Sequence, residues 1–333
     1  MSLTVHATLH SIAEVQAAIS DGESLFLAAS REALIQLPRG KWVGGSICYF
    51  MTEDGGLISE DKIFVTRVPE FVVGAEAVDY GPENLAQLYR DAPANGFTFV
   101  VMPAASKVLE TFAEHSAEYD GFLMRPVVGW VAGVRADLIG KDSPVVINGQ
   151  TGDLFENRCV ALHISLPDHI MADLDIVNIF ESQGGDVIRF EKAGFEVSDC
   201  LINDQRANLA DFLTVREVRT DFPLVGDYNG SLINVSFQKV DKIAHTVEFY
   251  APVFPGVNYR LAKPVADYEK AFAREIAASD QQPAFACNCI LNYLYGGLEG
   301  KKTGNITGPI TFGEIAHQLL NQTMVRLYLR DVG

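Results

Sequence analysis

The residues best suited to chemistry gather near the end of the chain. Cys287 and Cys289 are separated by one residue, and Glu314 precedes His317 by three. Thiolates are nucleophiles and soft metal ligands, and a Glu–His pair on one face can carry out acid–base work. One hypothesis is therefore a cysteine-dependent hydrolase or transferase that uses Cys287 or Cys289 with His317.

Other common catalytic patterns are missing from the sequence. A zinc site usually takes four ligands in two close pairs, but there is no second cysteine pair and the seven histidines are scattered. Gly44-Gly45-Ser46 does not continue as a nucleophile elbow, because Cys48 occupies the place of the second glycine. No Rossmann or Walker phosphate loop is present. We therefore expect no metal and no cofactor.

Polar side chains also stand inside or beside the apolar runs of this C-terminal stretch. They are Asn288, Asn292, Thr311, Glu314, Asn321 and Thr323. A buried polar group costs about 1–3 kcal/mol when it has no hydrogen-bond partner. These residues must therefore hydrogen-bond one another or face a ligand.

The elements that position these residues follow an order of strand, helix and glycine-rich strand. This order recurs at residues 24–50, 97–134 and 284–315, and it predicts similar substructures in the two lobes, centred on residues 24–50 and 284–315. Glycines within a strand allow close approach of another backbone or of a ligand, and both readings stay open here. Residues 9–20 have helical spacing, with Ser11 as the expected N-cap and Glu14 completing a capping box.

Composition narrows the class of protein. The 333 residues carry a net charge of −17, which argues against nucleic-acid or anionic-membrane partners. No apolar run approaches the roughly 20 residues of a membrane span, and five irregularly spaced cysteines indicate a reducing cytoplasm. We expect a two-lobed α/β protein of the α+β type, with mixed, largely antiparallel sheets flanked by helices. The predicted lobes are residues 1–205 and 206–333.

The C-terminal stretch also carries a family resemblance. Residues 305–315, followed by Asn321-Gln322-Thr323 before a final strand, resemble the C-terminal signature of the FIST sensory domain. Phe312 stands at the aromatic position before Gly313, and the resemblance is strongest over residues 284–329. The arginine expected soon after the cysteine-containing strand is absent. The resemblance implies a FIST N-like lobe at 1–205 and a FIST C-like lobe at 206–333.

The implied function is non-catalytic. Proteins of this kind are sensory, and the resemblance implies a small polar ligand between the lobes, with amino acids as the suggested class. A signal would pass to a protein partner. The expected ligand-binding residues are Cys287, Asn288, Asn292, Thr311, Phe312, Gly313, Glu314, Asn321 and Thr323, with Gly44, Gly45 and Ser46 closing the site from the other lobe. A structural interaction module is a further alternative to the enzyme hypothesis.

Overall fold

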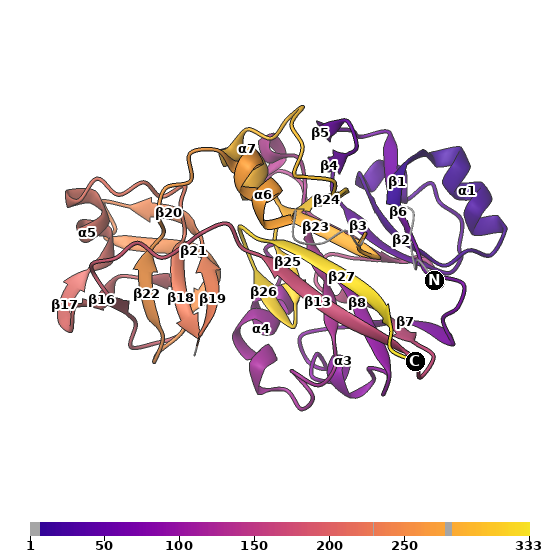
Figure 1. The fold of residues 1–333 in the computed structure, drawn as a ribbon, viewed down its shortest axis with the longest axis horizontal. Helices are drawn as coiled ribbons and strands as arrows, with labels where there is room; N and C mark the ends of the chain where they lie inside the picture. Colours follow the sequence, from indigo (N-terminus) through magenta and orange to yellow (C-terminus); the bar gives the residue numbers. More distant parts are fainter. Residues whose placement is uncertain (1–6, 229, 277–281) are drawn as a thin grey trace.

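Three repeats of one topology build the larger part of the molecule (Figure 1). The computed structural model describes residues 7–228, 230–276 and 282–333. Each repeat runs from an edge strand through a helix, a strand, a second helix and a glycine-rich strand to a hairpin and a return strand. A smaller lobe is inserted into the third repeat, so the molecule has two bodies of unequal size.

The first repeat occupies the N-terminal part of the chain. Its elements are β1 (Ala7–Ser11), α1 (Ile12–Ser20), β2 (Leu25–Ala29), α2 (Arg31–Leu34), β3 (Trp42–Ser46), β4 (Tyr49–Thr52), β5 (Gly55–Ile58) and β6 (Lys62–Arg67). The predicted capping box is confirmed: the Ser11 side chain accepts from the Glu14 backbone, and Glu14 accepts from the Ser11 backbone N–H at 2.7 Å. This satisfies amide groups that the first turn of a helix leaves unpaired.

The second repeat follows directly. Its elements are β7 (Gly74–Tyr80), α3 (Gln87–Arg90), β8 (Gly96–Pro103), α4 (Lys107–His115), the 3₁₀ helix η1 (Ser116–Glu118), β9 (Val127–Ala132), the 3₁₀ helix η2 (Ala136–Leu138), β10 (Val146–Asn148), β11 (Asp153–Phe155) and β12 (Cys159–Ser165).

The third repeat begins before the inserted lobe and resumes after it. Its elements are β13 (Ile170–Val177), α6 (Tyr268–Ile276), β23 (Phe285–Cys289), α7 (Ile290–Gly296), β24 (Gly308–Thr311), β25 (Glu314–Ala316), β26 (Gln318–Leu320) and β27 (Met324–Asp331). The pairs β2–β3, β8–β9 and β23–β24 are all parallel, so the structure confirms the repeat that the sequence predicts.

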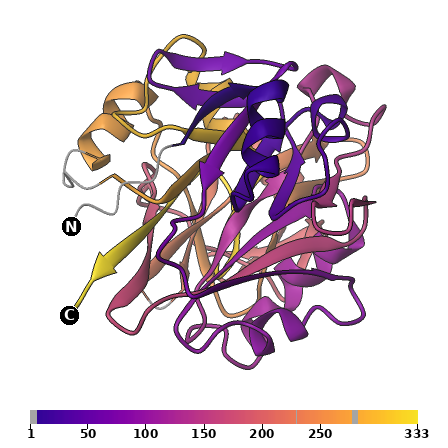
Figure 2. The same ribbon diagram turned by 90° about the vertical axis from the view of Figure 1, so that its right-hand side faces the viewer.

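The repeats exchange hairpins in a closed ring. The three six-stranded sheets run β1-β6-β2-β3-β10-β11, β7-β12-β8-β9-β25-β26 and β13-β27-β23-β24-β4-β5. Each sheet therefore ends in a hairpin contributed by a different repeat. Helices of the three repeats lie on different sides of this arrangement, indigo α1, magenta α3 and α4, and orange α6 (Figure 2).

Phenylalanines from the three equivalent strands meet in the core. The rings of Phe26 and Phe99 stack with centroids 3.7 Å apart, and Phe285 meets Phe99 edge-on at 4.9 Å. These residues lie at equivalent positions of β2, β8 and β23. Phe26 directly precedes Leu27, Phe99 precedes Val100, and Phe285 precedes Ala286, which is the equivalent residue of the third repeat. A shared aromatic contact of this kind holds the repeats together at their centre.

The inserted lobe spans residues 188–261. Its elements are β14 (Ile188–Arg189), β15 (Gly194–Val197), β16 (Asp199–Ile202), β17 (Gln205–Asn208), α5 (Leu209–Val215), β18 (Leu224–Tyr228), β19 (Ser231–Val235), β20 (Phe237–Asp241), β21 (Thr246–Val253) and β22 (Asn258–Leu261). It has its own sheets and a hydrophobic cluster made entirely of its own buried residues. The predicted boundary between residues 205 and 206 lies inside the β16–β17 hairpin, so the two predicted segments share a sheet.

Candidate functional site

A fully buried carboxyl group forms the centre of the candidate site. Glu314 is the first residue of β25 and has no exposed surface. Its Oε2 accepts hydrogen bonds from the Thr323 hydroxyl at 2.8 Å and from the Thr323 backbone at 3.2 Å. Oε1 has no hydrogen-bond partner. Burial raises the pKa of Glu314 to about 8, even though the bonds from Thr323 lower it, so the protonated acid predominates at neutral pH.

Asparagines extend this group from the neighbouring strand and helix. Asn292 on α7 donates to Asn288 Oδ1 at 3.0 Å and to the Thr323 carbonyl at 3.3 Å. Thr311 Oγ1 lies 3.4 Å from the carbonyl oxygen of Asn288 and 3.1 Å from that of Gly313. Five of the predicted site residues thus form one buried network, which we call the polar cluster: Asn288, Asn292, Thr311, Glu314 and Thr323.

Unpartnered polar atoms concentrate in this part of the fold. Among the described residues, each buried side-chain atom without a hydrogen-bond partner belongs to residues 268–328. Asn288 Nδ2, Asn292 Oδ1 and Glu314 Oε1 belong to the polar cluster, and Asn321 Nδ2 lies two residues from Thr323. The first two repeats satisfy their buried groups, so the shared topology does not cause these unpaired atoms.

The equivalent positions of the other repeats are apolar. A glycine faces the partner strand's carbonyl in each repeat, at Gly44, Gly129 and Gly308. Aligned on these glycines, Asn288 corresponds to Ala29 and Met102. By the same alignment, Thr311 corresponds to Ile47 and Ala132. The fold therefore does not need polar side chains at these positions.

The two cysteines lie beside the polar cluster with their thiols protonated. Cys287 and Cys289 are both buried, and Cys287 Sγ lies 3.6 Å from the carbonyl oxygen of Gly129. Burial holds the pKa of both thiols well above the ordinary value, and an ionised Glu314 would raise it further. All five cysteines of the chain are free.

His317 lies apart from this group. It follows β25 in the turn to β26, and its Nδ1 is 3.0 Å from the Phe122 carbonyl oxygen. His317 lies outside β25, at φ +60°, and its ring is directed to Phe122, whereas Glu314 bonds to Thr323. Burial lowers the pKa of His317 and favours its neutral form. The arrangement does not pair His317 with the cysteines as the enzyme hypothesis requires.

Gly44, Gly45 and Ser46 lie at the contact between the first two repeats. The Ser46 hydroxyl donates to the Gly133 carbonyl and accepts from Val145 N–H, both at 2.9 Å. A Cβ atom on Gly45 would lie 3.1 Å from the Trp130 ring, and Trp130 is the cross-strand partner of Glu314. These residues belong to the same body as the polar cluster and approach it through Trp130 and through Gly133, on which the Phe312 ring lies. The expectation that they close the site from another lobe is therefore wrong.

Phe312 and Gly313 support the site from its edge. A Cβ on Gly133 would fall 2.0 Å from the Phe312 ring, so the ring lies directly on this glycine. The Gly313 carbonyl accepts from Val131 N–H at 2.8 Å, which fixes the segment between Thr311 and Glu314.

Three tyrosines that the sequence analysis did not select interact electrostatically with Cys289. They are Tyr250 on β21 of the inserted lobe, Tyr268 on α6 and Tyr295 on α7. Burial is the main cause that raises the pKa of each, to about 12 for Tyr250. Asp221 raises the pKa of Tyr268 and Tyr295 further, and an ionised Cys289 thiol would add a smaller effect in all three. Asn292 and Tyr295 are three residues apart on one helix, and this spacing is the sequence signal that could have found Tyr295.

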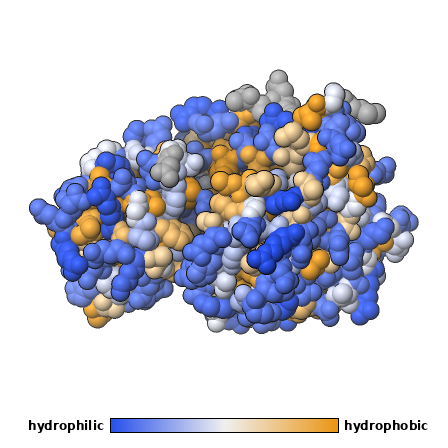
Figure 3. Space-filling model, turned by 90° about the horizontal axis from the view of Figure 1, so that it is seen from below, coloured by the Kyte–Doolittle hydropathy of each residue, from blue (hydrophilic) through white to orange (hydrophobic). Residues whose placement is uncertain are grey.

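The site therefore reaches the junction between the inserted lobe and the third repeat. Asn321 belongs to this junction, because its Oδ1 accepts from the backbone N–H of Ser236 in the lobe at 2.9 Å. Figure 3 shows a notch where the two bodies meet, with apolar residues on the larger body beside it.

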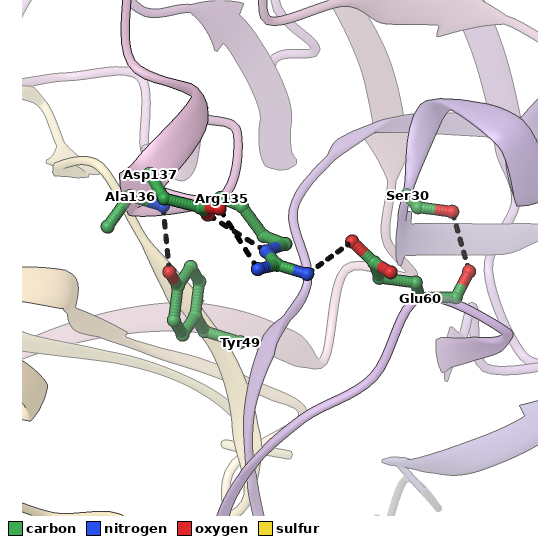
Figure 4. Close-up of polar contacts among 6 residues, drawn as sticks. All are labelled: Ser30, Tyr49, Glu60, Arg135, Ala136 and Asp137. Atoms are coloured by element: carbon green, nitrogen blue, oxygen red, sulfur yellow. Dashed lines mark hydrogen bonds and ion pairs between the residues drawn. The ribbon is translucent and has the colours of Figure 1, made fainter.

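A second polar group, around Arg135, has a structural explanation (Figure 4). Arg135 pairs with Asp137 at 2.9 Å and with Glu60 at 3.3 Å, and the Tyr49 hydroxyl accepts from Ala136 N–H at 2.9 Å. These exposed ion pairs join the first repeat to the second, and each charge has a partner. Exposed pairs contribute only about 0–1 kcal/mol each.

The fold and site define an α+β protein of three hairpin-exchanging repeats, with a buried polar cluster in the third. Residues 10–330 match the profile of a family described as a family of unknown function (DUF6976), and the chain belongs to that family. A comparison with curated proteins gives no match.

Residues 7–228, 230–276 and 282–333 contain neither a cluster of metal ligands nor a membrane-spanning helix. Within these ranges, no group of three or more His, Cys, Asp or Glu residues is arranged to hold a metal ion. No helix there is long and apolar enough to cross a membrane.

Proposed function

We propose that this protein is a non-catalytic ligand-binding protein that holds a small polar molecule at the polar cluster, beside the inserted lobe. The carrying observation is the set of buried, unpartnered atoms on Asn288, Asn292, Glu314 and Asn321. A buried polar atom without a partner costs about 1–3 kcal/mol, and the equivalent positions that can be compared in the other repeats are apolar. A bound molecule that pairs with these atoms removes this cost.

The chemistry of these atoms suits an amino acid. Asn288 Nδ2 and Asn321 Nδ2 are donors that a ligand carboxylate would match. Asn292 Oδ1 is an acceptor that an ammonium group would match, and the neutral Glu314 carboxyl offers its Oε1 hydroxyl as a further donor to the ligand carboxylate. The tyrosines near Cys289 would supply apolar walls for a side chain. A sensory role of the FIST kind, in the cytoplasm and with a signalling partner, belongs to this proposal.

The geometry supports the cysteine-dependent alternative less well. Its thiols have raised pKa values, and its histidine is held by the Phe122 carbonyl in the turn after β25. A nucleophilic cysteine normally needs a lowered pKa. The third alternative, a structural interaction module, predicts no small-molecule binding at all.

The test is isothermal titration calorimetry of the purified protein with the twenty common L-amino acids in turn. Asn288→Ala and Thr311→Ala introduce residues that the fold already accommodates at Ala29 and Ala132. We expect both variants to fold and to lose binding by roughly tenfold or more, about 1.4 kcal/mol. Thr98→Ala, a buried threonine of the second repeat, is the matched control and should bind normally.

Asn321→Ala is a less clean probe. It also removes the acceptor for Ser236 N–H, so lost binding and lost stability would occur together. Absence of any heat with all twenty amino acids, together with unchanged melting temperatures, would contradict the proposed ligand class.

A further inference from the structure

We propose that residues 321–323 couple the polar cluster to the docking of the inserted lobe, so that occupancy of the site changes how the lobe is held. This inference rests on the proposed function only for its ligand. The coupling itself is a property of the chain.

One side of this short segment binds the inserted lobe. The Gln322 side chain accepts from the Ser236 hydroxyl at 2.6 Å, and the Gln322 carbonyl accepts from Asn234 Nδ2 at 3.1 Å. Asn234 also exchanges two amide hydrogen bonds with Asn178, at 2.9 and 3.0 Å, where the chain leaves β13. Asn234, Ser236 and Gln322 are each at most 1% exposed, so these bonds do not compete with bulk water.

The other side of the segment binds the polar cluster. Thr323 donates twice to Glu314, and its carbonyl accepts from Asn292 at 3.3 Å. Gln322 and Thr323 are adjacent, so no flexible linker separates the two sets of bonds. A change in the position of Thr323 must move Gln322 with it.

The backbone of the segment is held in an uncommon conformation. Gln322 has φ +51°, in the left-handed region that non-glycine residues rarely adopt. Such a conformation persists when surrounding contacts fix it. Here the contacts with the inserted lobe and the contacts with the polar cluster fix the Gln322 backbone together. Loss of one set of contacts therefore loosens the other set.

A ligand would act on both sides at once. An acceptor placed against Asn321 Nδ2 orders the residue whose Oδ1 already holds Ser236 N–H. A ligand acceptor placed against the protonated Oε1 of Glu314 changes the carboxyl group that holds Thr323. Occupied and empty states therefore differ in the contacts that dock the lobe, which is the differential interaction that a population shift requires.

The experiment is hydrogen exchange at residues 231–237, first without any ligand. Glu314→Gln and Thr323→Val each alter the cluster without touching a lobe residue. We expect either variant to raise the exchange rate of the Ser236 amide by roughly tenfold or more. Thr98→Ala should leave that rate unchanged. Two variants are used because one of them could fail to fold, which melting curves would show.

The second arm uses the amino acid with the largest binding heat in the calorimetric panel. It should slow exchange at residues 231–237 in the wild-type protein, and the effect should be lost in Ser236→Ala. Unchanged exchange at Ser236 in both cluster variants would overturn the coupling even if an amino acid binds. If no amino acid binds, the proposed ligand class fails, while the ligand-free arm still decides the coupling.

Discussion

At the scale of single residues, the site is defined by a carboxylic acid kept neutral. Glu314 is buried among hydroxyl, amide and thiol groups, and its pKa is raised to about 8 mainly by burial. The unfolded chain has an ordinary carboxyl group with a pKa near 4.5. The folded protein therefore keeps a proton that the unfolded chain releases between these values, and stability must fall as pH rises through this window.

Replacing Glu314 with glutamine should remove this pH dependence. Each pKa unit corresponds to about 1.4 kcal/mol, so the wild-type protein should lose on the order of 3 kcal/mol relative to Glu314→Gln between about pH 5.5 and pH 8. Urea unfolding of both proteins at the two pH values gives this difference directly. Parallel stability curves would show that the carboxyl group is already ionised at the lower pH.

The cysteines offer a second measurement at the residue scale. Because the pKa of both Cys287 and Cys289 is well above its usual value, the native protein should react with iodoacetamide far more slowly near neutral pH than the urea-unfolded protein does. Mass spectrometry of the modified peptides identifies the thiol that reacts. Rapid native-state labelling that disappears in Cys289→Ser would favour the enzyme alternative.

At the scale of elements, the sequence predicted the repeats but not their exchange. Strand, helix and glycine-rich strand could be recognised at residues 24–50, 97–134 and 284–315 because hydrophobic periodicity and glycine spacing are local signals. The exchange of β4–β5, β10–β11 and β25–β26 between sheets depends on contacts distant in sequence. Asn148-Gly149 stands in the turn that joins β10 to β11, as Asn-Gly pairs often do.

The candidate site shows the same limit. Polar residues inside apolar runs identified Asn288, Asn292, Thr311, Glu314 and Thr323 as a group, and the structure brings them together. Tyr250 and Tyr268 could not be found in this way, because they approach Cys289 only through the placement of the inserted lobe and α6.

The glycine-rich strands lead to a prediction about packing. A Cβ on Gly129 would fall 1.7 Å from the Val100 carbonyl oxygen across the parallel β8–β9 pair. Gly129→Ala must therefore force the strands apart, at a cost of about 1–3 kcal/mol or more. Gly184→Ala is the control, because no atom lies within 4 Å of its added carbon. Equal melting temperatures for the two variants would mean that these strands can separate freely.

At the scale of the whole molecule, a closed ring carries an inserted lobe. Every sheet of the ring contains strands from two repeats, so no repeat can leave without breaking two sheets. The lobe instead buries its own cluster, which includes Leu213, Leu224 and Tyr259. The sequence indicated two bodies. The lobe is an insertion, however: the chain leaves one sheet after β13 and joins the same sheet again at β23, so two boundaries along the chain are needed to describe the lobe.

The last prediction follows from the lobe's own cluster, although Val225 and Ala251 of the lobe also pack into the clusters of the ring. Both tryptophans of the chain, Trp42 and Trp130, are buried in the ring, so their fluorescence reports only the unfolding of the ring. Leu213→Ala empties part of the lobe core and should destabilise the lobe by about 2–5 kcal/mol. The matched change Leu27→Ala does the same within the ring, where Leu27 and Trp42 share one cluster.

Denaturant unfolding followed by tryptophan fluorescence and by hydrogen exchange of residues 188–261 separates the two effects. We expect Leu27→Ala to lower the fluorescence midpoint, and Leu213→Ala to speed exchange in the lobe while that midpoint stays unchanged. An equal fall of the fluorescence midpoint in both variants would show instead that ring and lobe unfold as one cooperative unit, held together by contacts such as those of Gln322 with Ser236.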